Sequence, residues 1–228
     1  MYIYIYMQSL TIDRKKYLAF KSNVQKSGEF MSKYTDEEIK NEPMFFRSSY
    51  EFVKKNCGPI MKEFLSKVPK EYHKNCIIDS RSHMLMKGFW PCIPGWHHDD
   101  VPRTLKNGQP NYHDEKNNAQ FIMGLVNSHI SPTEFVVGVI VLPDIKRKVY
   151  NKWHDIVEKQ IENKELKTFK IKNDEILYFD NNSMHRCSPT TKFGWRWFAR
   201  LTINSILKPE NEMRQQVQIY LDDPTLGW

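Results

Sequence analysis

A series of short apolar runs between turn-forming residues most constrains how this chain of 228 residues can fold. Beyond residue 76 these runs alternate with segments rich in Gly, Pro, Asn and Ser. They read IID, SHMLMKGFW, NAQFIMGLV, EFVVGVIVL, KTFKIK, EILYFD, RWFARLTINSI and QVQIYL. Short runs bounded by such turns are typical of strands rather than helices. The sequence therefore predicts a mainly β core over about residues 77–221.

Helical signals precede this β region. Thr35 with Glu38, and Ser48 with Glu51, have the spacing of a capping box. In that motif two side chains satisfy backbone N–H groups that would be free at the start of a helix. We therefore expect supporting helices over about residues 35–67.

Three further segments complete the expected organisation. Residues 149–163 carry apolar side chains at helical spacing, and the alternating Tyr and Ile of residues 2–6 predict a strand. Residues 101–117 are rich in Asn, Gly, Pro and charge, which is typical of a mobile loop. The length favours one domain over residues 1–228, of the mainly β class with supporting helices (α+β).

The formal net charge of +7 permits attraction to nucleic acid, because excess lysine creates a long-range positive field. The lysines are nevertheless spread along the chain without a block of five or six. Such a distribution is equally typical of an ordinary solvated surface. Charge alone therefore leaves a nucleic-acid partner open.

Cysteine spacing and hydropathy bear on the cellular setting. The four cysteines form no Cys-x-x-Cys pair, so they predict neither a zinc knuckle nor a disulfide framework: Cys57, Cys76, Cys92 and Cys187. The longest apolar run, residues 135–143, is too short to cross a bilayer. We expect a cytoplasmic protein without a membrane role.

The segment GWHHDD contains two overlapping His-x-Asp pairs, His97 with Asp99 and His98 with Asp100. Alternate residues on a strand point to the same side, so either pair can present an imidazole and a carboxylate together. A metal that binds both an oxidisable co-substrate and dioxygen needs open coordination positions, which two imidazoles and one carboxylate leave free. His185, after the EILYFD strand, can supply the second imidazole.

Two arginines follow His185 on the next predicted strand. Arg196 and Arg200 are four residues apart, so they share one face of that strand and can point into one pocket. The planar fork of a guanidinium can hold a carboxylate through two hydrogen bonds, which an ammonium group cannot do.

Together, GWHHD, EILYFDNNSMHRCSP and GWRWFARLTI resemble the Fe(II)/2-oxoglutarate-dependent dioxygenases. The arginine spacing after the distal histidine is similar to the taurine-dioxygenase-like and phytanoyl-CoA-hydroxylase-like branches. The resemblance covers about residues 80–205. It implies a double-stranded β-helix, or jelly-roll, that binds Fe(II) and 2-oxoglutarate and hydroxylates a substrate while 2-oxoglutarate becomes succinate.

The resemblance also implies residue roles. An aromatic residue often precedes the metal histidine in this family, which favours His97 and Asp99, with His185, as metal ligands and catalytic residues. By offset, Arg196 would hold 2-oxoglutarate, and Arg200 would bind an acidic substrate group or share the co-substrate. His98 would then face the other side.

Three further expectations concern residues near these motifs. Asp100 could pair with Arg103 or cap the following turn. Three residues on an upstream strand could line the pocket: Arg81, His83 and Lys87. The tryptophans are expected in packing rather than as substrate platforms: Trp90, Trp96, Trp195 and Trp197.

Two other function classes remain open: a non-catalytic metal-binding jelly-roll module and a basic nucleic-acid-binding protein. For an enzyme, the substrate could be a small acid or a nucleobase, and the latter would need stacking aromatic residues beside the metal. The segment 101–117 is the expected lid or specificity element. The oligomeric state is left open.

Overall fold

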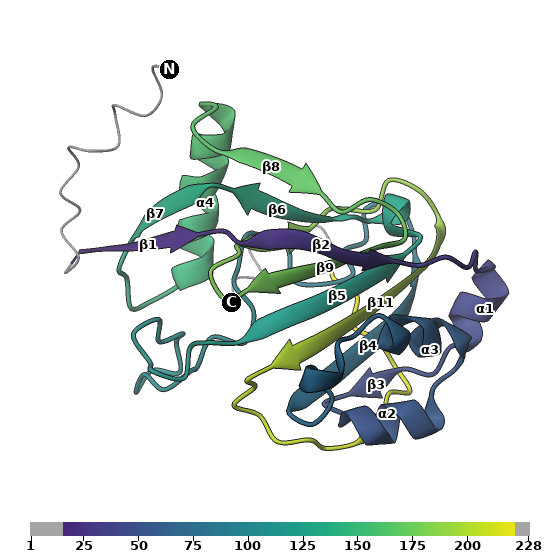
Figure 1. Cartoon of the computed structure of the whole chain (residues 1–228). Coiled ribbons are helices and arrows are strands. Elements are labelled where there is room, and N and C mark those ends of the chain that lie inside the picture. Colours follow the sequence, from purple (N-terminus) through teal and green to yellow (C-terminus); the bar gives the residue numbers. More distant parts are fainter. Residues whose placement is uncertain (1–15, 222–228) are drawn as a thin grey trace, which may run out of the picture.

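The computed structural model describes residues 16–221, so the strand expected over residues 2–6 lies outside the described part (Figure 1). Its helices are α1 (Asp36–Asn41), α2 (Tyr50–Asn56), α3 (Pro59–Ser66) and α4 (Val149–Glu162), with 3-10 turns η1 (Lys70–Tyr72) and η2 (Ser128–Ile130). Its strands are β1 (Tyr17–Lys21), β2 (Val24–Glu29), β3 (Phe45–Phe46), β4 (Cys76–Leu85), β5 (Gln120–Val126), β6 (Thr133–Val137), β7 (Val139–Pro143), β8 (Lys167–Lys170), β9 (Glu175–Asp180), β10 (His185–Cys187), β11 (Gly194–Ile203) and β12 (Glu212–Met213). The expected β-rich class with supporting helices is confirmed.

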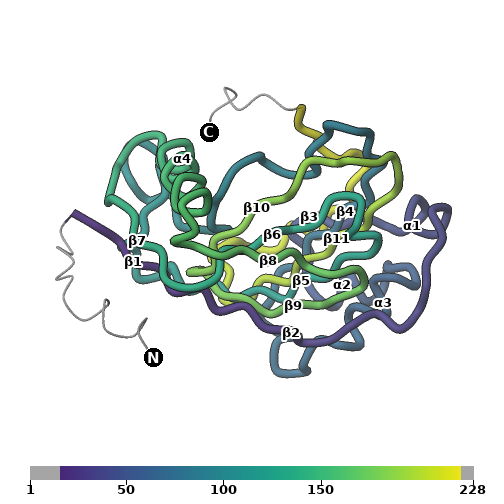
Figure 2. The backbone as a smooth tube through the Cα atoms, turned by 90° about the horizontal axis from the view of Figure 1, so that it is seen from above, coloured from purple at the N-terminus to yellow at the C-terminus, as the bar shows by residue number. Residues whose placement is uncertain are grey.

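The strands form antiparallel sheets. A five-stranded sheet has the order β2-β9-β5-β11-β4, and a three-stranded sheet has the order β10-β6-β8. Two strand pairs, β1-β7 and β12-β3, extend this arrangement. Figures 1 and 2 show α1, α2 and α3 gathered near β4 and β11, whereas α4 lies at the opposite end beside β7.

The five-stranded sheet buries both faces. On β11, Trp197, Ala199 and Leu201 pack with α1, α2 and α3 in one core cluster. On β5, Phe121 and Leu125 point the other way, toward a second cluster that includes residues of the three-stranded sheet. Successive strand residues face opposite sides, so these apolar runs support a layer on each face.

The contact between the two sheets is aromatic. Phe135 of β6 meets Phe179 of β9 edge-on, with ring centroids 5.1 Å apart, and within its own sheet it stacks on its cross-strand partner Phe169 of β8 at 5.4 Å. Such pairs add to the free energy of burial through the quadrupoles of their rings. The two sheets therefore pack face to face.

The helix starts partly follow the capping patterns. Thr35 and Glu38 form both hydrogen bonds of the expected capping box of α1. The second expected box is wrong by one residue, because Ser49, not Ser48, caps α2 and accepts a hydrogen bond from the N–H of Phe52. Ser48 is buried and bridges to Ile78 of β4, so a sheet contact replaces the capping role.

The strand predictions differ from the structure where the chain bends. The run EFVVGVIVL is divided at Gly138, whose φ of 105° turns the chain from β6 into β7, in a different sheet. Conversely, the first two runs, IID and SHMLMKGFW, share the single strand β4, which ends at Leu85. The region before residue 77 also contributes β2 to the five-stranded sheet, which the polar sequence VQKSGE did not indicate.

Two other segments have irregular backbone. Residues 101–117 contain neither helix nor strand, as expected of a loop, and of QVQIYL only Tyr220 forms a bridge, with Trp90. Over residues 16–221, no helix is both long and apolar enough to cross a membrane.

Candidate active site

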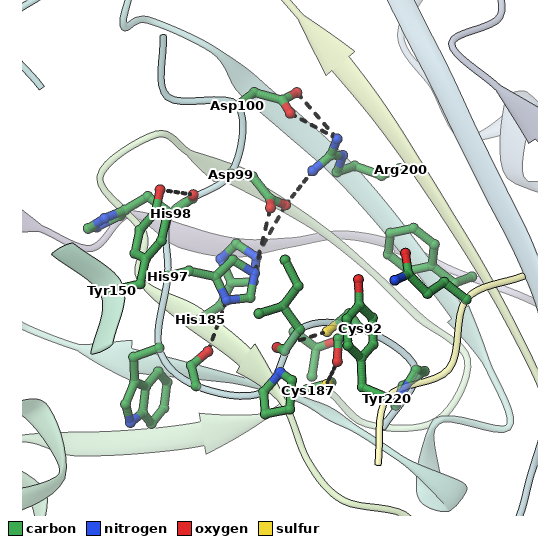
Figure 3. Close-up of a pocket in the computed structure, with 18 of the residues that line it drawn as sticks. Cys92, His97, His98, Asp99, Asp100, Tyr150, His185, Cys187, Arg200 and Tyr220 are labelled. Carbon is green, nitrogen blue, oxygen red and sulfur yellow. Dashed lines mark hydrogen bonds and ion pairs between the residues drawn. The ribbon is translucent and has the colours of Figure 1, made fainter. Parts of the chain in front are cut away.

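His97, Asp99 and His185 converge, as predicted from the sequence (Figure 3). The Nε2 atom of His185 lies 3.2 Å from Asp99 Oδ2, and that of His97 lies 3.7 Å from Asp99 Oδ1. The backbones of the two histidines exchange two N–H···O bonds of 3.0 Å, which join β10 to the GWHHDD segment. The possible ligand atoms of His97, Asp99 and His185 lie within 4.8 Å of one another, close enough to share a metal ion.

Backbone carbonyls orient both imidazoles. The Nδ1 atom of His97 lies 2.9 Å from the carbonyl oxygen of Gly95, and that of His185 lies 3.0 Å from the carbonyl oxygen of Ser183. A proton on each Nδ1 donates to these acceptors, which leaves each Nε2 as the ring atom available to a metal ion. The backbone thus selects the tautomer that a metal ion requires.

Burial and charge separate the titrations of the two histidines. Burial, aided by nearby His185, lowers the pKa of His97 to about 4, which keeps this imidazole neutral at pH 7. Burial also acts to lower the pKa of His185, but the Asp99 carboxylate outweighs it and raises that pKa above its usual range. The carboxylate is therefore the dominant charge acting on His185.

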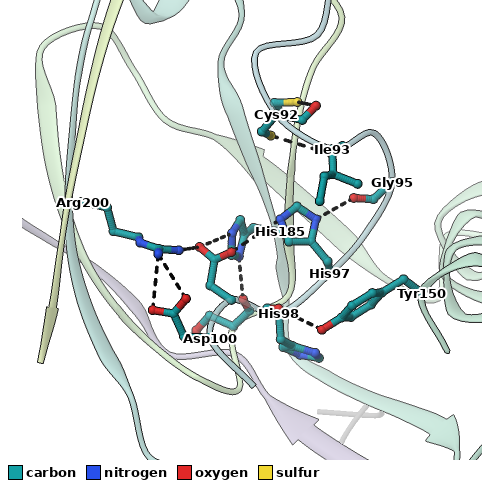
Figure 4. Close-up of polar contacts among 12 residues, drawn as sticks. Cys92, Ile93, Gly95, His97, His98, Asp100, Tyr150, His185 and Arg200 are labelled. Atoms are coloured by element: carbon teal, nitrogen blue, oxygen red, sulfur yellow. Dashed lines mark hydrogen bonds and ion pairs between the residues drawn. The ribbon is translucent and has the colours of Figure 1, made fainter. Parts of the chain in front are cut away.

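His98 lies outside this cluster (Figure 4). Its side chain is buried, with Nδ1 3.1 Å from the hydroxyl of Tyr112 and its ring 4.5 Å from that of Phe20. Burial lowers the pKa of His98 to about 3. The geometry therefore selects His97 with Asp99, and the neighbouring histidine serves packing.

The guanidinium of Arg200 is paired with acidic side chains, so it does not offer two free N–H groups to a ligand. One nitrogen of its guanidinium contacts Asp99, and Nη2 lies 3.1 Å from Oδ1 of Asp100. Thr202 donates a further hydrogen bond of 3.2 Å to Asp100, whereas Arg103 donates to the carbonyl of Gly108. The expected Asp100–Arg103 pair is wrong. Asp100 has a positive φ of 50°, and its carboxylate points toward β11 instead of toward Arg103.

The Arg200 contact also affects ionisation of Asp99. Burial acts to raise the pKa of this carboxyl, but the Arg200 guanidinium and His185 hold it well below its usual range. Asp99 is therefore ionised at neutral pH and can act as an anionic ligand.

Arg196 is buried, and no carboxylate of residues 16–221 pairs with it. Its side chain is 3% exposed, its Nε atom has no hydrogen-bond partner, and its Nη2 atom makes one long contact of 3.5 Å to Thr133. Burial lowers the pKa of Arg196 to about 10, so the group remains charged at neutral pH. A buried guanidinium with an unused fork is suited to a carboxylate ligand.

Both arginines face a cavity of about 580 Å³. Arg81 and His83 of β4 also line it, as predicted, because they alternate on the strand that pairs with β11. Lys87 lies beyond the end of β4 and is not part of the lining. The cavity falls within the range of about 300–1,000 Å³ that is usual for small-molecule sites.

Some lining residues gave no signal in the sequence. Tyr150 at the start of α4 donates its hydroxyl to the carbonyl of His98, at 3.1 Å. Cys92 faces the same cavity, and the thiol of Cys187 donates to its carbonyl oxygen at 3.4 Å. Gln218 and Tyr220 of the C-terminal segment also line the cavity. No local motif identifies these residues, because separate loops bring them together.

The tryptophans serve mainly in packing. Trp197 is fully buried under the helices, and Trp96 is buried beside α4 with its indole N–H donating to Glu158 at 2.5 Å. Trp90 and Trp195 are half-buried. Trp96 also lines the cavity, so it supports the loop that carries His97.

The chain was compared with protein-family models, with curated proteins and with solved structures, and none of them matched. The geometry of this cavity is therefore the guide to function.

Proposed function

We propose that this protein is an Fe(II)- and 2-oxoglutarate-dependent oxygenase with a jelly-roll core. The observation that carries the proposal is the His97–Asp99–His185 cluster in one cavity with the unpaired guanidinium of Arg196. Two imidazoles and one carboxylate on one side of a metal ion leave positions for two further ligands, which is typical of non-haem Fe(II) oxygenases.

The donor set fits a divalent cation electrostatically. Arg200 carries one positive charge, and Asp99 and Asp100 carry two negative charges when ionised, which sum to −1. The imidazole of His97 is neutral, with its Nε2 lone pair directed at the cluster. A divalent ion would offset the excess negative charge and would be held by His97, Asp99 and His185.

Arg196 fits 2-oxoglutarate. Its fork lacks an anionic partner, and a carboxylate would satisfy the donors that burial leaves unused. Thr133, next to the Arg196 guanidinium, can donate a hydroxyl hydrogen bond to the same carboxylate. We therefore assign Arg196 to the distal carboxylate of the co-substrate.

The residues of the chain would then have separate roles. Bound Fe(II) would supply oxidative chemistry in which dioxygen gives one oxygen atom to 2-oxoglutarate, which becomes succinate and carbon dioxide, and the other to the substrate, which is hydroxylated. Gly95 and Ser183 fix the histidine tautomers, and Arg200 keeps Asp99 ionised and oriented. These groups would react inside a concave cavity in which His185 and Arg196 are buried.

The test is anaerobic titration of the purified chain with Fe(II) and 2-oxoglutarate, monitored by the weak visible charge-transfer band of such a chelate. We expect the band to appear, and Arg196→Lys to weaken 2-oxoglutarate binding by about 10- to 100-fold, because lysine loses the two-point contact. Arg147→Lys, at an exposed arginine, is the matched control. Metal binding without the band would instead support a non-catalytic metal-binding module.

A further inference from the structure

A second guanidinium in the same cavity has no partner. Arg81 lies on β4 between Asp79 and His83, which share its cavity-facing side. Its side chain is half-buried, and among residues 16–221 it forms no hydrogen bond or ion pair. A guanidinium stays protonated even without a partner, so the positive charge of Arg81 remains in the cavity.

Nearby acidic groups are already occupied. Asp79 accepts hydrogen bonds from Arg214 Nη2 at 3.4 Å and from the backbone N–H of Arg47 at 3.3 Å. Asp99 and Asp100 both bind Arg200. The described chain therefore supplies no carboxylate to Arg81.

The surroundings of Arg81 are positive. Burial lowers the pKa of Arg81, and the charges of Arg214 and Arg200 lower it further, against the smaller opposing effects of Asp79 and Cys92. Arg81 in turn acts electrostatically on Arg196 and on the phenol of Tyr220. An anion that entered this part of the cavity would meet several cations together.

Register places Arg81 between the two arginines of β11. Its cross-strand partner is Phe198, and the neighbouring pairs are Arg200 opposite Asp79 and Arg196 opposite His83. Arg81 thus lies on the cavity wall between the arginine that holds the metal-ligand carboxylate and the arginine assigned to 2-oxoglutarate.

We propose that Arg81 binds the anionic group of the substrate, and that the substrate is a small acid carrying a carboxylate or phosphate group. This inference rests on the proposed function. Among residues 16–221, neither Arg81 nor Arg196 has an anionic partner, and 2-oxoglutarate has one distal carboxylate. One guanidinium therefore remains for the substrate.

A small acid fits this wall better than a nucleic acid. The anion has to enter the cavity to reach Arg81, beside Phe198, with Gln218 and Tyr220 of the C-terminal segment also lining the space. When an enzyme extrudes a nucleobase into its pocket, the charged backbone stays outside the pocket. A phosphodiester at the cavity mouth would leave Arg81 without a partner.

The test observes arginine side chains directly. Full-length protein labelled with nitrogen-15 at arginine, with Zn(II) in place of Fe(II) and saturating 2-oxoglutarate, is titrated with propionate and, separately, with inorganic phosphate. NMR monitors the Nε–H signals, and Arg81→Lys assigns the Arg81 signal by its loss. We expect that signal to shift saturably with at least one anion, which also identifies the preferred group. Arg147, which is exposed, should not shift saturably.

Variants measure the contribution of the contact. With the Nε–H signal of Arg200 as reporter, Arg81→Met should raise the anion concentration at half-saturation by about 10- to 100-fold, since a charge-assisted contact is lost. Arg81→Lys keeps the positive charge and controls for misfolding. Its anion concentration at half-saturation should lie between those of the unmodified protein and Arg81→Met. Arg147→Met is the control with unchanged anion binding.

Three results would overturn the inference: no saturable shift at Arg81, equal affinity in Arg81→Met, or a response of Arg81 rather than Arg196 to 2-oxoglutarate itself. Failure of the proposed function has a different signature. In that case 2-oxoglutarate produces no visible band with Fe(II) and no shift at Arg196, while the propionate and phosphate titrations still report on Arg81.

Discussion

At the residue scale, adjacent side chains in the GWHHDD segment have opposite environments. His97 faces Asp99 and His185, whereas His98 packs against Phe20 and Tyr112. The alternation follows from extended backbone, which points successive side chains to opposite sides. One imidazole is therefore available to a metal ion, and the next contributes to the core.

This difference predicts distinct losses. His97→Ala should lower Fe(II) affinity by more than about 100-fold, because a ligand is lost from a three-residue set. His98→Ala should retain Fe(II) binding but destabilise the fold by roughly 2–4 kcal/mol, because it opens a cavity among aromatic rings. Anaerobic metal titration and denaturant unfolding measure the two effects. Equal loss of metal binding in both variants would reject the assignment.

His83 predicts a pH effect on stability. Burial, with Arg196 and Arg81 nearby, lowers the pKa of His83 well below its usual value, so the folded chain keeps this imidazole neutral. The unfolded chain binds a proton below about pH 6.5, so stability is present above that pH and lost as pH falls, by up to about 1.4 kcal/mol per pH unit.

His83→Gln should therefore show a shallower loss of unfolding free energy between pH 6.5 and 5. Urea unfolding at several pH values gives this slope, and His129→Gln, at an exposed histidine, should keep the original slope. Identical slopes in all three proteins would show that His83 does not resist protonation.

At the scale of elements, α3 packs closely on the five-stranded sheet where β5 has a glycine. A Cβ at Gly124 would lie 2.9 Å from Phe64 of α3 and 3.0 Å from Phe30. Contacts this short force the rings or the helix to move, because protein cores are close-packed. The glycine thus sets the distance between helix and sheet.

Gly124→Ala should destabilise the fold by about 1–3 kcal/mol through this overpacking. Gly28→Ala on β2 is the matched control, since its added Cβ would meet its nearest neighbour, Lys67, at an ordinary 3.6 Å. Denaturant midpoints compare the two. A Gly124→Ala protein as stable as the Gly28→Ala protein would mean that α3 can shift without cost.

At the scale of the whole molecule, the cavity depends on both sheets. His185 belongs to β10 of the three-stranded sheet, whereas Arg196 and Arg200 belong to β11 of the five-stranded sheet. A metal ion with 2-oxoglutarate would therefore connect the two layers. A ligand that binds only the folded state stabilises it by RT ln(1 + L/Kd), where L is the free ligand concentration, so the gain grows with the logarithm of that concentration.

We expect 2-oxoglutarate to add about 2.7 kcal/mol to the free energy of unfolding of the Fe(II)-bound protein when the free co-substrate exceeds its Kd 100-fold. Anaerobic thermal unfolding measures the gain as an increase in Tm. Arg196→Met should retain the part due to Fe(II) and lose the part due to 2-oxoglutarate at that concentration. No increase in Tm with either ligand would contradict the proposed site.

The sequence alone determined those features whose causes are local. Thr35 and Glu38 cap α1 because they are three residues apart, and α4 follows from its apolar spacing. Strand alternation and residue chemistry left both His-x-Asp pairs and both arginines open, and only the resemblance to the Fe(II)/2-oxoglutarate-dependent dioxygenases favoured His97, Asp99 and Arg196.

Only the tertiary structure decided which distant groups meet. Arg200 contacts Asp99 and Asp100, about a hundred residues earlier, and Arg81 lies opposite Phe198. These contacts depend on strand register and on the path of loops, and a shift of one residue would reverse every side chain. The division at Gly138 was hidden for the same reason, because its apolar neighbours read alike in either sheet. Local pattern thus indicated the candidate residues, and packing decided which groups they contact.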